Sequence, residues 1–392
     1  VIKVADTEYN AQCVIETIKA ADEMGVKLLV FPELVLTGCT CYDLTGHNVV
    51  LRGAKKALLE VIAASEGVDM LVFVGLPVAV GSRLYSCAAA IYDGELLGLV
   101  PRENVRGTQF AEPADSYVEV EIDAEHVAVL STDYVFTCAA LPDLKVAAEL
   151  GADIDALVPP SVRHAQAGAT VIAQLASFPE TVTSADEAEL TLRSQSRRLH
   201  CGMVMAAPGK GESTTDNVFS GLCMIAENGE VLAASECENS MAVTELDVEY
   251  IINTRRESDD FDLDSDEYYE AVWGGEPVET ELTRSYRKYP HLPADEADLP
   301  TYCERMLDIQ VSGLVKRMQY AGLDHCVVGI SGGVDSTLAV MVSAMAVKKM
   351  GLPSTNVVAC TLPCFGTSSR TKSNAIVVAE QLGAEVRVID IG

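Results

Sequence analysis

The chain has 392 residues, with 58 acidic and 28 basic side chains and a formal net charge of −30. This length exceeds one typical hydrophobic core, so we expect two domains. Hydrophobic residues make up 49% of the chain, which excludes a disordered protein. The negative charge disfavours binding to nucleic acids or anionic membranes, because phosphate contacts need a basic surface. The longest apolar run, around residues 337–347, is too short to span a bilayer.

The two ends of the sequence predict a longer protein. The chain starts with Val1 and shows no signal-peptide pattern. It ends in a strand-like run over residues 385–392 with no closing helix, so we expect the second domain to be incomplete at its C-terminus. The cysteines and histidines show no metal-ligand spacing, which favours buried thiols in a reducing cytoplasm.

Apolar spacing and turn residues predict an α/β domain over residues 1–250. Asp93-Gly94 and Asn228-Gly229 suit type I′ turns, so each predicts a β-hairpin. The predicted helices cover residues 11–24, 54–64, 141–150 and 185–200, and the predicted strands outside the hairpins cover residues 27–31, 70–74, 127–130, 154–158 and 203–207. Mixed strands joined by helices and hairpins indicate two sheets in a layered arrangement.

Residues 251–300 change in character and predict an acidic linker or surface arm. A dense acidic run covers residues 257–267, and Gly274-Gly275 and several prolines follow it. Residues 301–392 then predict a second domain whose first helix is capped near Thr301. Its later elements alternate as strand, helix, strand, helix and strand, the order of a doubly wound parallel sheet.

The segment Ser331-Gly332-Gly333-Val334-Asp335-Ser336-Thr337 joins a buried strand directly to a helix. Glycines let the backbone approach phosphate oxygens, and a helix N-terminus offers free N–H groups to an anion. The serines add hydroxyl donors. An acid fits such a site when a cation lies between it and the phosphates, and Mg²⁺ is the natural choice. The segment therefore predicts a nucleotide-phosphate site, with a serine-capped turn as the alternative.

This loop resembles the Ser-Gly-Gly-x-Asp-Ser loop of the N-type ATP pyrophosphatases and lacks the Gly-Lys-Ser/Thr of a Walker loop. Upstream, Phe31-Pro32-Glu33-Leu34-Val35-Leu36-Thr37-Gly38 resembles the glutamate motif of the nitrilase superfamily. Residues 211–216, 293–296 and 362–368 extend the resemblance along nearly the whole chain. In this order, the motifs resemble those of the glutamine-dependent NAD⁺ synthetases.

The resemblance implies a nitrilase-like αββα sandwich followed by a doubly wound parallel α/β domain of the ATP pyrophosphatase type. It implies a ligase that converts ATP, deamido-NAD⁺ and ammonia to NAD⁺, AMP and pyrophosphate through an adenylate, with ammonia drawn from glutamine. ATP and Mg²⁺ are the implied cofactors, and the implied enzyme is a cytoplasmic homo-oligomer that pairs through its nitrilase-like domain. By the same resemblance, ATP-binding roles fall on Gly329, Ser331, Gly332, Gly333, Asp335, Ser336, Leu362, Thr367 and Arg370, with Asp335 as the metal ligand.

The amidase motifs depart from the family pattern, which has a Glu base, a Lys and a Cys nucleophile at a strand end. By the resemblance, Glu33 is the base, Arg102 stands at the lysine position and Ser131 at the nucleophile position. A serine hydroxyl is not ionised near neutral pH, and arginine cannot act as a compact ammonium. We therefore expect an impaired glutaminase site. Cys138 is the alternative nucleophile.

Two other functions remain open from the sequence. One is another amide ligase with the same pyrophosphatase loop, and the other is a non-catalytic scaffold or regulatory paralogue. The amidase-first order of the motifs favours the synthetase over the first alternative. The intact loop from Ser331 to Ser336 disfavours the second, because a scaffold needs no acid beside phosphate donors.

Overall fold

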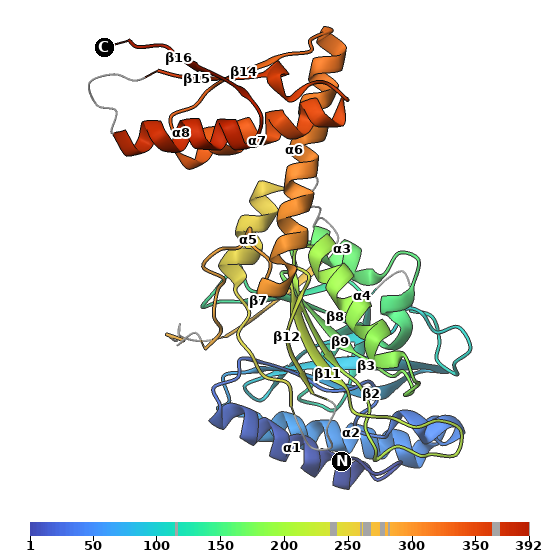
Figure 1. The fold of residues 1–392 in the computed structure, drawn as a ribbon. Coiled ribbons are helices and arrows are strands. Elements are labelled where there is room, and N and C mark those ends of the chain that lie inside the picture. Colours follow the sequence, from blue (N-terminus) through green and yellow to red (C-terminus); the bar gives the residue numbers. More distant parts are fainter. Residues whose placement is uncertain are drawn as a thin grey trace. The chain divides into compact units, whose positions relative to one another are not determined.

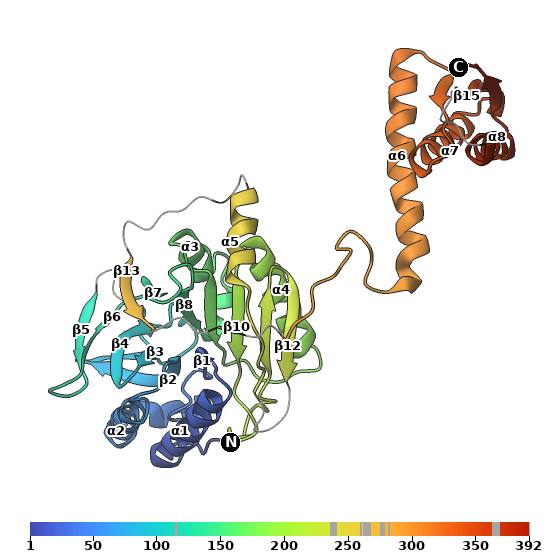
Figure 2. The ribbon, with the colours of Figure 1, turned by 90° about the vertical axis from the view of Figure 1, so that its left-hand side faces the viewer.

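The computed structural model describes residues 1–113, 117–235, 241–258, 261, 268–274, 279–280, 283–362 and 369–391. The chain divides into two compact units, Val1–Ser285 and Tyr286–Gly392. Figures 1 and 2 show the elements of each unit. No helix among these described residues is both long and apolar enough to cross a membrane.

A six-stranded sheet and two helices form one half of the first unit. Helices α1 (Thr7–Glu23) and α2 (Asn48–Ala64) cover the outer face of the sheet (Figure 2). The strands lie in the order β1-β2-β3-β4-β6-β5. Their bounds are β1 (Leu28–Val30), β2 (Leu71–Val80), β3 (Arg83–Tyr92), β4 (Glu95–Pro101), β5 (Val118–Glu121) and β6 (Val127–Leu130).

A seven-stranded sheet forms the other half of this unit, in the order β12-β11-β10-β9-β8-β7-β13. Helices α3 (Pro160–Gln166) and α4 (Ser184–Arg198) pack on its outer face, and α5 (Val248–Glu257) follows β12. The strand bounds are β7 (Tyr134–Cys138), β8 (Lys145–Leu150), β9 (Val171–Leu175), β10 (Gly202–Ala206), β11 (Cys223–Glu227), β12 (Glu230–Ser235) and β13 (Tyr269–Trp273).

The side-chain alternation along β2 shows how the layers are held together. Val72 and Val74 point into a core shared with α1 and α2, whereas Leu71 and Phe73 point into a second core between the two sheets. There Phe73 meets Phe136 of the facing sheet edge-on, with ring centroids 5.3 Å apart. The unit is therefore an αββα sandwich, as predicted.

Both predicted hairpin turns are present. Asp93 and Gly94 have φ values of +46° and +76°, and Asn228 and Gly229 have values of +46° and +90°. Two successive positive φ angles are the requirement of a type I′ turn, which these residues meet at little cost. The turns join β3 to β4 and β11 to β12.

Two predicted elements are wrong, and both lie in one stretch. The predicted helix over 141–150 is strand β8, which pairs with β9 on one side and β7 on the other. Its alanines, leucine and glutamate favour a helix in isolation, but burial between two strands overrides that preference. The predicted strand over 154–158 is instead the end of a 3₁₀ turn, η2 (Gly151–Asp155), and the loop after it. Helix α3 and strand β9 were not predicted.

The second unit is a parallel three-stranded sheet with helices in its crossovers. Helix α6 (Leu299–Ala321) starts before the predicted cap at Thr301. The strands β14 (Cys326–Gly329), β15 (Val357–Thr361) and β16 (Glu385–Val388) pair in chain order, joined by α7 (Val334–Lys349) and α8 (Ser369–Gln381). This is the predicted alternation of strands and helices. Two short 3₁₀ turns, η3 (Glu296–Asp298) and η4 (Ser354–Asn356), complete the unit. The first unit contains η1 (Cys39–Gly46) in addition to η2.

Candidate functional site

Glu33 lies in the turn after β1 and is buried, with 1% of its surface exposed. Its Oε1 accepts a hydrogen bond from Ser86 Oγ at 2.6 Å, and both carboxylate oxygens accept from Arg102 Nη1 at 3.2 Å. The backbone N–H of Glu33 donates to the carbonyl of Ala176, which follows β9 in the facing sheet. The carboxylate therefore sits where the two sheets meet, held by a hydroxyl and a guanidinium.

Arg102 comes directly after β4 and completes this ion pair. Its backbone N–H donates to the Ser86 carbonyl at 2.8 Å, which continues the β3–β4 ladder and aims the side chain at Glu33. Its Nε donates to the Asn104 carbonyl at 2.9 Å, and only 11% of the side chain is exposed. The structure thus brings together Glu33 and Arg102, the expected base and the residue at the lysine position. Their catalytic roles stay predictions.

A third backbone segment reaches this pair, at the end of β8. Gly151 has φ of +54°, and a Cβ built on it would lie 2.5 Å from Glu33 Oε2 and 2.6 Å from Arg102 Nη1. Its carbonyl accepts from Gln174 Nε2 of β9 at 2.9 Å. A glycine therefore occupies the strand end that points into the Glu33–Arg102 pair.

Asp153 fixes this strand end against the loop after Arg102. Its carboxylate accepts backbone N–H groups from Leu150 at 3.1 Å, Glu103 at 3.2 Å and Asn104 at 2.6 Å. Burial raises the pKa of Asp153 to about 6, against the opposing effect of these hydrogen bonds. Hydrogen bonds to Asp153 therefore join the turn after β8 to the turn after β4.

Ser131, the predicted nucleophile, lies at the end of β6. Its backbone N–H donates to the Leu99 carbonyl, and its Oγ accepts from the Asp133 N–H at 3.2 Å. Within the described residues, its hydrogen bonds include none to Glu33 or Arg102, so its role remains a prediction. The Cys138 thiol lies in the core between the two sheets.

Sequence reasoning missed Gly151, although a signal was present. The family pattern places its nucleophile at a strand end, and Gly151 directly follows β8 just as Ser131 directly follows β6. The predicted helix over 141–150 concealed the strand end before Gly151.

A cavity of about 380 Å³ opens beside the ion pair. Polar and aromatic side chains from four loops surround it, which gives it the mixed lining of a small-molecule site. Its lining residues are Glu33, Leu34, Cys39, Thr40, Tyr42, Asp43, Thr45, Arg102, Gly107, Thr108, Gln109, Phe110, Ser177, Pro179, Asn217 and Phe219.

The motif at 211–216 supports one wall of this cavity. Glu212 is buried and accepts from the N–H groups of Cys39 at 2.9 Å and Thr40 at 3.0 Å, and from Thr40 Oγ1 at 2.6 Å. Burial, together with the carboxylates of Glu212 and Glu33, raises the pKa of the Cys39 thiol well above its ordinary value. This thiol in the cavity therefore stays protonated near neutral pH.

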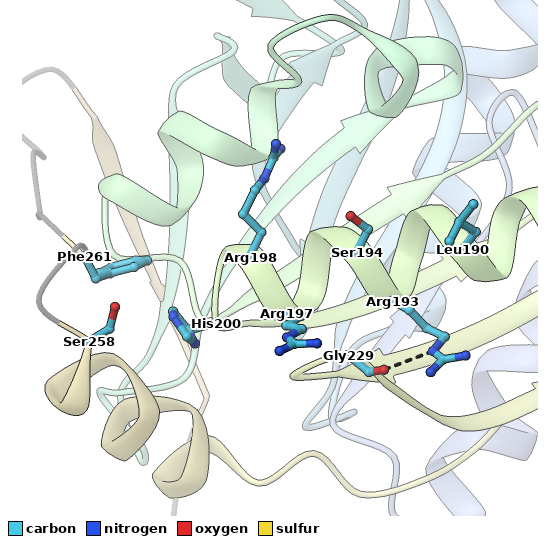
Figure 3. Close-up of a pocket in the computed structure, with 9 residues that line it drawn as sticks. All are labelled: Leu190, Arg193, Ser194, Arg197, Arg198, His200, Gly229, Ser258 and Phe261. Atoms are coloured by element: carbon cyan, nitrogen blue, oxygen red, sulfur yellow. Dashed lines mark hydrogen bonds between the residues drawn. The ribbon is translucent and has the colours of Figure 1, made fainter. Parts of the chain in front are cut away.

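A second hollow, of about 800 Å³, lies along α4 and carries three arginines. Arg193 donates to the Gly229 carbonyl at 3.0 Å and to Glu189, while Arg198 bonds Gln195. Figure 3 shows Arg198 pointing away from the side of α4 that Arg193 and Arg197 share with Gly229. The guanidinium groups do not converge on one point, so the hollow presents no defined anion site.

The loop predicted to bind nucleotide phosphates connects β14 to α7 in the second unit. Ser331 and Ser336 lie at its two ends with their Oγ atoms 3.1 Å apart, and Ser331 Oγ also accepts from the Gly333 N–H at 3.3 Å. Gly332 has φ of +84°, which a side chain would strain. Asp335, in the first turn of α7, is exposed. The loop therefore presents hydroxyls, N–H groups and one carboxylate around a helix N-terminus.

The remaining predicted nucleotide residues are placed in part. Leu362, at the end of β15, is 45% exposed and is the nearest neighbour of a Cβ built on Gly329, at 3.9 Å. Thr367, like Cys364, falls outside the described residues, and Arg370 is described only as part of the α8 backbone. Among the described residues, no three histidine, cysteine or acidic side chains form a metal-binding cluster.

A family comparison decides what the first unit is. The model of the carbon-nitrogen hydrolases matches residues 2–256, more than half of the chain. The chain belongs to the carbon-nitrogen hydrolase family. The NAD synthase family model matches residues 306–392 in the second unit.

Individual relatives carry both parts in the same order. The chain is 34% identical over 408 residues to the "Glutamine-dependent NAD(+) synthetase" of Mycobacterium bovis, and 33% identical over 407 residues to that of Mycobacterium leprae. Each alignment covers 99% of this chain but 60% of the relative, so the chain spans about 60% of the length of these relatives.

Two solved structures share the fold. They are a glutamine-dependent NAD(+) synthetase from Cytophaga hutchinsonii (TM-score 0.54, 16% identity, 99% of this chain and 63% of that chain) and one from Acinetobacter baumannii in complex with ADP (TM-score 0.52, 18% identity, 100% of this chain and 63% of that chain). At these identities the likeness concerns the fold alone. It agrees with the predicted sandwich followed by a parallel α/β domain.

Proposed function

We propose that this chain takes part in NAD⁺ synthesis, the ATP-dependent amidation of deamido-NAD⁺ with release of AMP and pyrophosphate. The observation that carries the proposal is the order of two family matches, a carbon-nitrogen hydrolase over 2–256 followed by an NAD synthase over 306–392. The relatives that share this order along 99% of the chain are named as glutamine-dependent NAD(+) synthetases. This order disfavours another amide ligase, and the intact loop from Ser331 to Ser336 disfavours a scaffold.

In this proposal, the carboxylate of deamido-NAD⁺ attacks the α-phosphorus of ATP, and pyrophosphate leaves. Ammonia then attacks the adenylated carbonyl carbon and AMP leaves. The loop from Ser331 to Ser336 holds the phosphates through its N–H groups and hydroxyls, in the way a helix N-terminus binds anions. Leu362, Thr367 and Arg370 complete the proposed ATP site.

Mg²⁺ fits this donor set as a shared ion. Asp335 offers one exposed carboxylate beside the hydroxyls of the loop. Mg²⁺ is commonly held by one or two carboxylates together with substrate phosphates, so a site without a full protein cage is suitable. Asp335 would hold the ion, which would neutralise charge on the phosphates. The net charge of −30 makes such local neutralisation important.

The second part of the proposal is that the amidase site does not hydrolyse glutamine. Its support is the glycine at the strand end that contacts Glu33 and Arg102, since Gly151 carries no nucleophile. A nitrilase-type reaction needs a thiolate there to form the acyl intermediate. The ammonia would then come from solution or from a partner. Cytoplasmic location and homo-oligomerisation through the first unit belong to the same proposal, and the free thiols of the described cysteines suit a reducing compartment.

The nitrogen-donor assay tests both parts with the full-length enzyme. NAD⁺ formation should proceed with ammonium and be at least ~100-fold slower with glutamine, the loss expected when covalent catalysis is absent. Equal rates with glutamine would overturn the inactive-amidase proposal, and a Ser131→Ala variant would then test whether Ser131 is the nucleophile. No NAD⁺ from either donor would overturn the synthetase proposal.

ATP binding tests the loop separately. Asp335→Asn should weaken ATP binding in the presence of Mg²⁺ by roughly tenfold or more, measured by calorimetry, because one carboxylate ligand is lost. Asp324→Asn is the matched control, since Asp324 is exposed and its carboxylate pairs with the adjacent His325. Equal loss in both variants would refute a specific role for Asp335.

A further inference from the structure

The space at position 151 is already occupied. A Cβ on Gly151 would lie 2.5 Å from Glu33 Oε2 and 2.6 Å from both Cζ and Nη1 of Arg102. Ordinary van der Waals contact begins about 1 Å further out, so a side chain and the guanidinium cannot share this volume. Neither the thiol of a nucleophile nor even a methyl group fits here while Arg102 keeps its place.

The guanidinium is held at this point by three partners. It bonds both oxygens of Glu33 through Nη1, and its Nε bonds the Asn104 carbonyl. Glu33 is 1% exposed, and a buried carboxylate without a counter-charge is costly. A lysine at 102 would supply the charge but not the planar fork that fills the space beside Gly151.

The ion pair, and not position 151, lines the cavity. Glu33 and Arg102 are among the lining residues of the cavity of about 380 Å³, whereas Gly151 is buried and is not among them. A ligand that enters the cavity therefore meets the guanidinium and the carboxylate.

We propose that Arg102 and Gly151 are a matched pair, in which the guanidinium fills the room of a missing nucleophile side chain and converts Glu33 into a structural counter-ion. This assignment rests on the proposed non-hydrolysing amidase site, and it explains why the substituted site stays packed. It also means that a side chain at 151 and an arginine at 102 exclude one another.

A double-mutant cycle in the whole protein tests the pair, using Gly151→Ala, Arg102→Lys and the double variant. Gly151→Ala should lower the melting temperature of the first unit by about 5–10 °C, from the overlap plus the left-handed φ. In the Arg102→Lys background the same alanine should cost less, because the overlap with the guanidinium is gone and only the overlap with Glu33 and the left-handed φ remain. The double variant should therefore be less destabilised than the sum of the two single effects.

Gly81→Ala is the matched control for the backbone term. Gly81 has φ of +58°, close to the +54° of Gly151, and a Cβ there meets nothing within 4 Å. It should lower the melting temperature by only about 2–5 °C, the cost of the left-handed conformation alone. A Gly151→Ala shift no larger than the Gly81→Ala shift would overturn the proposal.

Failure to fold also gives an answer. If Gly151→Ala does not fold and the double variant does, the pair is supported. If neither folds while Arg102→Lys does, the guanidinium is not what excludes a side chain, and the pair is refuted. The nitrogen-donor assay distinguishes the two proposals. Glutamine use with intact coupling would overturn the proposed loss of hydrolysis, and with it the missing nucleophile at 151, whereas the packing of Arg102 against Gly151 would stand.

Discussion

Arg255 of α5 is the most informative place to perturb the first unit, because it is 8% exposed and bonds four backbone carbonyls. Its Nη2 donates to Ala169 at 2.6 Å, and its Nε donates to His200 at 2.9 Å. Longer contacts of 3.4 Å reach Gly168 and Leu199. These carbonyls follow α3 and α4, so one guanidinium joins the ends of two helices to a third.

Arg255→Met should destabilise this unit by roughly 2–5 kcal/mol. The two short bonds leave buried carbonyls without a donor when they are lost, at about 1–3 kcal/mol each. Part of this loss is offset, because burying the guanidinium is itself costly and lowers the pKa of Arg255 to about 10. The melting temperature should fall by roughly 5–15 °C.

Differential scanning calorimetry of Arg255→Met against Arg256→Met measures the effect. Arg256 is the next residue on the same helix, is exposed, and donates to Asn253 Oδ1 at 3.1 Å. Its replacement should change stability by less than about 0.5 kcal/mol. If the two variants melt together, the four-carbonyl clamp does not stabilise the fold and the reasoning is wrong.

Two further predictions concern buried polarity and glycine. Burial raises the pKa of Glu149 from 4.5 to about 8. The stability that its protonated carboxyl contributes is therefore fully present below pH 4.5 and is lost as the pH rises through 8. Glu149→Gln should therefore flatten the fall in melting temperature between these pH values, and an unchanged slope would contradict the shift. Gly75→Ala should lower the free energy of unfolding in urea by more than about 3 kcal/mol, because its Cβ would lie 2.4 Å from the backbone N of Leu34. Gly313→Ala, with open space in α6, should raise it by about 0.5–1 kcal/mol. Equal effects at the two glycines would show that the backbone moves to make room for a Cβ at position 75.

The parts of the fold that follow local rules were predictable. Asp93-Gly94 and Asn228-Gly229 form the hairpin turns that their tolerance of positive φ predicts. The second unit shows the predicted alternation of strands and helices, and its central strand β15 is the buried apolar run that such a strand requires. The meeting of Glu33 and Arg102 also followed from a motif-level resemblance.

The failure at β8 has a long-range cause. Residues 145–150 are composed of helix-favouring types, yet all but Lys145 are buried, because β7 and β9 flank them. Neither neighbour is visible from the local sequence. The predicted helix also hid the strand end at Gly151, whose close approach to residues 33 and 102 depends on the folded structure. Ser131 stays the predicted nucleophile position.

The single tryptophan of the chain gives β13 a practical meaning. Trp273 is 2% exposed and its indole N–H donates to the Phe136 carbonyl at 3.1 Å, where β13 closes the edge of the sheet against β7. The family match ends at residue 256, but a chain cut there would leave β7 as an open edge, which invites aggregation. The first unit therefore needs residues beyond 256, up to the end of β13, to fold with a closed sheet edge. Tryptophan fluorescence alone can report when that last strand has docked.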